Sequence, residues 1–124
     1  MNQRNTLAVG AIMGGLAVAF GAFGAHALKG LLTQNGRVET YELAVRYQIY
    51  HALALLLIGL LMDKFQAPGM KLSGVSMLIG ILFFSGSLYA FALTNITSYA
   101  LITPFGGLFF LMGWGLLIAG VLKK

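Results

Sequence analysis

The fold class is decided by residues 7–28, LAVGAIMGGLAVAFGAFGAHAL, a stretch without any Asp, Glu, Lys or Arg. Three further predominantly apolar stretches follow, at about residues 43–62, 72–93 and 101–122. Each is about 20–22 residues long, which as a helix is enough to cross a ~30 Å hydrocarbon layer. The sequence therefore predicts an all-α, polytopic membrane protein in which residues 1–124 form one domain, a single bundle of four transmembrane helices.

The composition excludes several other classes of protein. Hydrophobic residues make up 59 % of the chain and charged residues 9 %, against about 25 % charge in soluble domains. The chain has no cysteine, so disulfides and thiolate metal sites are excluded. The net charge of +5 comes from basic residues scattered over short polar segments, which does not form a nucleic-acid-binding stripe. We expect the lipid bilayer as the partner, no nucleic acid and no cofactor.

The basic residues also predict the orientation in the cell membrane. Four crossings place both termini and the 63–71 link on one side, where the chain carries Arg4, Lys64, Lys71, Lys123 and Lys124. The other side carries Lys29 and Arg37, with Arg46 just inside the second helix. Because short cytoplasmic segments are enriched in Lys and Arg, both termini are predicted to be cytoplasmic. The first apolar run is longer than the 7–15 residues of a signal-peptide core, so we expect it to be a retained helix.

Turn residues mark the ends of the predicted helices. Gly30 suits a left-handed stop after the first helix, and Pro68-Gly69 breaks the chain between the second and third. Thr103 followed by Pro104 resembles a helix N-cap and first position, so the fourth helix is expected to start there. Residues 99–102 would then be a half-buried lead-in.

Small residues form two stripes that predict close helix packing. Gly10, Gly14, Ala17, Gly21 and Gly24 recur at steps of four and three along the first helix, and the fourth helix carries Gly106, Gly113 and Gly120. Small residues let helix backbones approach closely in lipid. We interpret the stripes as packing seams within the bundle or between copies in a homo-oligomer; the alternative is a groove for a lipid tail. Trp114, near the middle of the last helix, is expected to find an internal partner for its N–H.

The polar residues of the helices gather in the outer half of the membrane. Residues 49–62 span only ~20 Å, so the second helix must include the polar residues before and within them to cross. Counting depth at ~1.5 Å per residue puts His51 and Ser85 at nearly the same height. The resulting candidate site contains His26, Arg46, Tyr47, Gln48, His51, Ser85, Ser87 and Tyr89.

Two interpretations of this polar cluster stay open. In the first it is structural, with an i, i+4 ion pair between Glu42 and Arg46 and with His51 bonded to a serine or a backbone carbonyl. We also expect His51 to have a hydrogen-bond partner from the first helix, the third helix or a trapped water. In the second it is a cavity that binds a ligand through His26, Arg46 and His51. A metal site is disfavoured because no HxxxH or ExxH spacing is present. Catalytic residues are not expected either, since no serine has an adjacent base.

Four motifs resemble a known family. They are GAFGAHAL at residues 21–28, RYQIYHALAL at 46–55, FSGSLYA at 84–90, and TPFGG at 103–107 with Gly113-Trp114. In this order they are similar to the YwdK/YgdD-like family of small four-helix bacterial membrane proteins, which has distant mitochondrial relatives. The resemblance implies an inner-membrane location and brings no established activity, substrate or cofactor.

Two functions compete at this point. The first is a binding or permeation protein for a small solute or a lipid, with its polar site in the outer half of the bundle. The second is a non-catalytic accessory subunit that docks to a larger membrane complex through glycine-rich helix faces. An enzyme acting on lipid is disfavoured, because the sequence shows no paired carboxylates and no nucleophile with its base.

Overall fold

The computed structural model describes residues 1–123, and within them all regular structure is helical. The elements are α1 (Gln3–Ala25), α2 (Lys29–Asn35), α3 (Val38–Leu61), α4 (Pro68–Gly80), the π-helical turn η1 (Ile81–Ser85), α5 (Gly86–Thr94), the 3-10 helix η2 (Thr97–Leu101) and α6 (Thr103–Leu122). Four helical segments are long and apolar enough to cross a membrane: Gln3–Ala25, Val38–Leu61, Pro68–Thr94 and Thr97–Leu122. The predicted all-α fold with four spans is confirmed.

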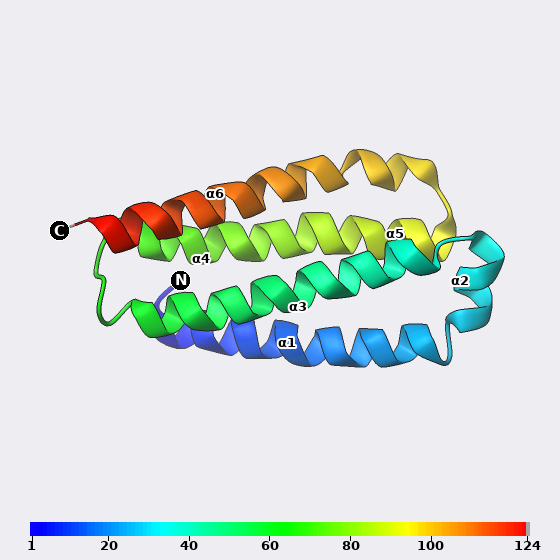
Figure 1. The fold of residues 1–124 in the computed structure, drawn as a ribbon, viewed down its shortest axis with the longest axis horizontal. Helices are drawn as coiled ribbons and strands as arrows, with labels where there is room; N and C mark the ends of the chain where they lie inside the picture. The colour runs from blue at the N-terminus through cyan, green and yellow to red at the C-terminus, as the bar shows by residue number, and fades with distance from the viewer. Residues whose placement is uncertain (124) are drawn as a thin grey trace.

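The helices lie side by side in the order α1, α3, α4–α5, α6 (Figure 1). α1 packs chiefly on α3, α6 packs chiefly on α4 and η1, and α3 meets the α4–α5 helix between them. The start of α1, the end of α6 and the α3–α4 link lie at one end of the bundle, whereas α2 and the α5–η2 link lie at the other. Consequently α1 and α6 occupy opposite edges of this arrangement.

The link after the first span differs from the prediction. α1 ends at Ala25, and the chain then forms the short helix α2, which contains Gly30 in a helical conformation. Gly30 is therefore not the left-handed stop; Gly36 takes that role after α2, with φ of 68°. α2 forms because Leu32, only 1 % exposed, packs in a cluster with Tyr41 and Ala92.

The two prolines lie where the sequence predicts. Pro68 and Pro104 each occupy the first turn of a helix, α4 and α6 respectively, where a missing N–H costs no hydrogen bond. The lead-in to α6 is the 3-10 helix η2, which follows Asn95 in a left-handed conformation, φ 58°. The N-cap of α6 is Ile102 and not the expected Thr103, whose hydroxyl bonds to another helix.

The glycine stripes of α1 and α6 face neighbouring helices of the same chain. A Cβ on Gly10 would lie 3.1 Å from the Ala52 carbonyl oxygen of α3, and one on Gly24 would overlap the Tyr41 ring. On α6 a Cβ at Gly106 would overlap the backbone of Phe84 in η1. A Cβ at Gly113 or Gly120 would overlap Met77 or Met70 of α4 in the same way, whereas one at Gly14 or Gly21 would make only ordinary contacts with α3 side chains, at 3.9 Å and 3.4 Å. Most of the stripe glycines therefore lie where a neighbouring helix approaches closely.

Candidate functional site

The polar residues of α3 point to different neighbours, so the predicted cluster divides into separate groups. Gln48 is 2 % exposed and bridges three helices. Its Nε2 donates to the Met13 carbonyl of α1 at 2.9 Å, and its Oε1 accepts from the Tyr89 hydroxyl of α5 at 2.7 Å. The Tyr89 ring packs edge-on against Tyr41, with centroids 5.2 Å apart. Because both polar atoms of the Gln48 amide have partners, this group holds the bundle together.

The two predicted serines form links of their own. The Ser85 hydroxyl donates to the Ala44 carbonyl at 2.7 Å, which ties η1 to α3. Ser87 shares a 2.6 Å hydrogen bond with Thr103, which ties α5 to the start of α6. Neither serine contacts His51 through a hydrogen bond, and sequence reasoning gave no sign of Thr103 as a partner.

His51 belongs to a different group, formed with α6. Its Nδ1 lies 2.8 Å from the Tyr47 carbonyl oxygen, and Trp114 donates its indole N–H to His51 Nε2 at 3.2 Å. A carbonyl can only accept and an indole N–H can only donate, so the two bonds require a neutral ring protonated on Nδ1. The imidazole also stacks on Phe110, with centroids 3.5 Å apart and planes 9° from parallel.

The partners of His51 correct the prediction in part. A backbone carbonyl was expected, and the Tyr47 carbonyl of the same helix is one. A partner from the first or third helix or a trapped water was also expected, but the other partner is on the last helix. The expectation that Trp114 has an internal partner is confirmed, since its N–H reaches His51. Phe110 was missed in the sequence, although its i, i+4 spacing from Trp114 puts both rings on one helical face.

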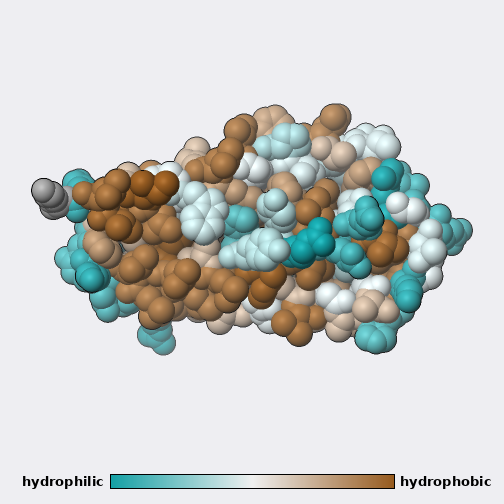
Figure 2. Space-filling view, viewed as in Figure 1, coloured by the Kyte–Doolittle hydropathy of each residue, from teal (hydrophilic) through white to brown (hydrophobic). Residues whose placement is uncertain are grey.

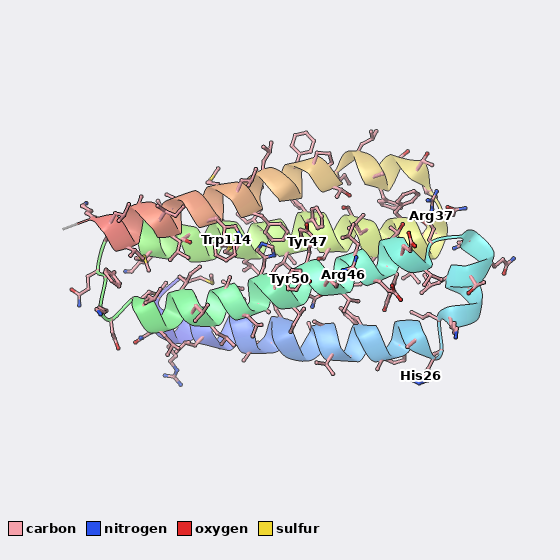
Figure 3. All side chains as sticks on the ribbon, in the orientation of Figure 1. His26, Arg37, Arg46, Tyr47, Tyr50 and Trp114 are labelled. Carbon is pink, nitrogen blue, oxygen red and sulfur yellow. The ribbon has the colours of Figure 1, made fainter. Side chains whose placement is uncertain are left out.

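A groove between α3 and α6, here called the aromatic groove, runs past this group. Its volume is about 660 Å³. Tyr47, Tyr50 and Trp114 lie along it in Figure 3, and the Tyr47 ring stacks on Phe84 with centroids 4.6 Å apart. The remaining lining residues are His51, Pro104, Gly107, Leu108, Phe110 and Leu111. The groove therefore combines aromatic faces, two phenol hydroxyls and an apolar wall.

Arg46 and Glu42 lie nearer the start of α3, beside a second groove of about 380 Å³ that is formed with α2 and the end of α1. We call it the basic groove; it is bounded by Gly21, Gly24, Ala25, Lys29, Leu32, Val38, Tyr41, Glu42, Val45 and Arg46. Both Glu42 and Arg46 are exposed. No hydrogen bond or ion pair between these two described residues is present, so the predicted Glu42–Arg46 pair is not formed.

His26 joins neither group. Its side chain is exposed at the end of α1, points away from the bundle in Figure 3, and bonds only to the Ala22 carbonyl of its own helix, at 2.9 Å. A single cavity shared by His26, Arg46 and His51 is therefore wrong, because the three side chains leave their helices in different directions. Within residues 1–123 no three His, Asp, Glu or Cys side chains are grouped as a metal would require.

Comparison with known proteins agrees with this helical membrane architecture. The family model described as "Protein of unknown function (DUF423)" matches residues 20–107. A UPF0382 membrane protein of Staphylococcus epidermidis is 43 % identical over 115 residues, 93 % of each chain.

Two further relatives are the proteins after which the family resembled by the sequence motifs is named. YwdK of Bacillus subtilis, a UPF0382 membrane protein, is 39 % identical over 93 % of this chain and 94 % of its own. The UPF0382 inner membrane protein YgdD of Escherichia coli is 37 % identical over 99 % of this chain and 93 % of its own. No solved structure matches the chain. The chain belongs to the UPF0382 (DUF423) family of membrane proteins.

Proposed function

We propose that this membrane protein binds one amphiphile of the bilayer in the aromatic groove, and that it is not an enzyme. The observation that carries the proposal is the side-by-side placement of Tyr47, Tyr50 and the His51–Trp114 pair along an open groove between α3 and α6. A groove on the outside of a membrane bundle is entered sideways, from the lipid.

The depth of the groove narrows the class of ligand. His51 is the fourteenth residue of α3, which places it ~20 Å along a helix that is ~36 Å long. The head of a phospholipid stays at the membrane interface, so it does not reach this level. An amphiphile whose weakly polar head lies within the hydrocarbon layer does reach it.

The chemistry of the walls favours a flat conjugated head. The rings of Phe84 and Trp114 offer surfaces for offset stacking or edge contact, whereas the Phe110 ring is buried and already stacked on His51. The hydroxyls of Tyr47 and Tyr50 offer donors for a carbonyl oxygen. Leu108 and Leu111 continue the groove as hydrocarbon. Together these groups suit a quinone-type ring that carries an apolar tail.

The other functions considered from the sequence have less support. Permeation through the bundle is opposed by its filled centre, where Leu55, Ile58 and Met77 are fully buried. Docking to a larger membrane complex through the glycine stripes is opposed, because stripe glycines such as Gly10, Gly24 and Gly106 face helices of the same chain.

Quenching of tryptophan fluorescence tests the proposal. Trp114 is the only tryptophan and lines the groove, so a decyl-substituted benzoquinone bound there should quench its emission in a saturable manner. Gly107→Phe fills the groove from a position where an added Cβ meets nothing, and it should abolish the saturable phase. Gly15→Phe, equally uncrowded but on α1, is the matched control and should retain it. Linear quenching that is identical in all three proteins would show simple partitioning into the detergent and would refute the site.

A further inference from the structure

We infer that the basic groove holds the phosphodiester head of a membrane phospholipid, independently of any ligand in the aromatic groove. Two cations reach this groove from different elements: Lys29 is the first residue of α2, and Arg46 lies about two turns into α3. The carboxylate of Glu42 lines the same groove. These three charges sum to +1, which complements the single negative charge of a phosphodiester.

The space for a head group comes from missing side chains. Gly21, Gly24 and Ala25 form the α1 side of the groove. A Cβ on Gly21 would contact only Val45, at 3.4 Å, although Gly24 is covered by the Tyr41 ring. The end of α1 therefore leaves a hollow beside α3, and the groove volume of about 380 Å³ has room for a phosphate.

Arg46 is placed to reach the membrane interface. It lies eight residues after the start of α3, about 12 Å along the helix. At such a depth a long Arg side chain keeps its stem in the apolar region and extends its guanidinium toward the head groups. A guanidinium donates paired hydrogen bonds to phosphate oxygens, which makes it a stronger phosphate ligand than a point charge.

The surroundings of the groove favour a lipid over free phosphate. The exposed stripe of α3 runs from Glu42 and Arg46 through Tyr50 to leucines at Leu53 and Leu57. In Figure 2 the hydrophilic colour correspondingly extends from the α2 end to about the middle of the visible face and then gives way to a hydrophobic surface. A lipid with a charged head and an acyl tail matches this change from a charged to an apolar surface along α3. An inorganic ion matches only the charged part.

The experiment uses the full chain in neutral detergent and three probes: short-chain phosphatidylglycerol, inorganic phosphate and the matching neutral diacylglycerol. Binding is counted by native mass spectrometry. The phospholipid should bind, and neither other probe should bind or compete with it. Competition by inorganic phosphate at equal concentration would overturn a lipid site, and equal binding of the diacylglycerol would overturn phosphate recognition.

Variants that change the charge of the groove in opposite directions distinguish an effect on binding from an effect on folding. Lys29→Gln and Arg46→Gln should each weaken phosphatidylglycerol binding about fivefold, as expected for one basic residue near an anionic lipid. Glu42→Gln should strengthen it, because the groove becomes more positive. Arg4→Gln removes an exposed cation at the opposite end of the bundle and should change nothing.

Equal effects of Arg4→Gln and Arg46→Gln would show unspecific attraction and refute the site. Weakening by Glu42→Gln would also refute it, because loss of a negative charge cannot weaken an electrostatic anion site. Gly107→Phe should leave phosphatidylglycerol binding unchanged, so the outcome here does not depend on the outcome for the aromatic groove.

Discussion

The indole N–H of Trp114 donates a hydrogen bond to Nε2 of His51 across 3.2 Å, and this bond connects α6 to α3. α3 packs most extensively on α1, and both α3 and α6 pack on the α4–α5 helix that lies between them. His51 is 5 % exposed and Trp114 is 40 % exposed. One ring is thus held inside the bundle, while the other presents a face to the groove. The bond therefore joins the two helices that form the walls of the aromatic groove.

Loss of this bond should destabilise the protein modestly. Trp114→Phe keeps an aromatic ring but leaves His51 Nε2 without its donor, at an expected cost of about 1 kcal/mol or slightly more in the free energy of unfolding. A double-mutant cycle with His51→Phe, followed by unfolding in mixed micelles, measures the coupling. Strict additivity of the two substitutions would contradict the bond.

The Gln48–Tyr89 hydrogen bond should contribute more, because its acceptor is buried. Tyr89→Phe leaves the Gln48 Oε1 without a donor in a residue that is 2 % exposed, which should cost about 1–3 kcal/mol. Tyr50→Phe removes the hydroxyl of a tyrosine that is 53 % exposed and serves as the control, with no expected change. Unfolding of the two variants at the same denaturant concentration would show that the buried bond is unimportant.

Two adjacent glycines of α6 should respond oppositely to alanine. A methyl group on Gly106 would overlap the backbone of Phe84, which cannot rotate away, whereas one on Gly107 would meet nothing within 4 Å. We expect Gly106→Ala to lower the unfolding free energy by about 1–3 kcal/mol. Gly107→Ala should leave it unchanged or raise it slightly, because alanine favours helix. Thermal unfolding monitored by circular dichroism distinguishes the two, and equal melting temperatures would refute this packing.

The orientation in the membrane can be measured directly, since the chain has no cysteine. The α2 end carries Lys29 and Arg37, and more basic residues lie at the end with the termini; Lys124, which belongs to the predicted set, lies outside the described residues. A cysteine at Gln34, in α2, should therefore react with an impermeant maleimide in intact cells. A cysteine at Gln66, in the α3–α4 link, should react only after permeabilisation. The reverse pattern would place the termini outside.

Hydropathy predicts the spans of this fold but not the helix between the first two. A seven-residue helix such as α2 is too short to be stable by propensity alone. It depends on Leu32 meeting Tyr41 and Ala92, which come from α3 and α5. This contact exists only once the bundle has formed. The sequence of residues 29–35 alone therefore predicts a link and not a helix.

Depth counting predicts the height of a side chain in the membrane but not its direction. Gln48 and His51 are three residues apart, yet one bonds to α1 and α5 and the other to α6. Which helix lies on which side of α3 depends on packing among all four spans. The sequence therefore identified these polar residues but combined them into one cluster, and it missed the groove formed with Phe84 and Phe110.

The π-helical turn at Ile81–Ser85 determines the directions in which the side chains of the following helix, α5, point. The Gly86 N–H bonds to the carbonyl of Ile81, five residues back, so the turn holds one more residue than an α-helix would. Deleting a single residue there would restore a regular helix and leave the residues beyond it on nearly the same faces, because the wider turn is what absorbs the extra residue. If all residues were kept and the turn became α-helical, everything beyond it would rotate by ~100°. Tyr89 would then face away from Gln48, and Ser87 away from Thr103. The wide turn therefore keeps the two halves of the third span in phase with their neighbours, and a substitution that straightened it would uncouple them although the chain length stayed the same.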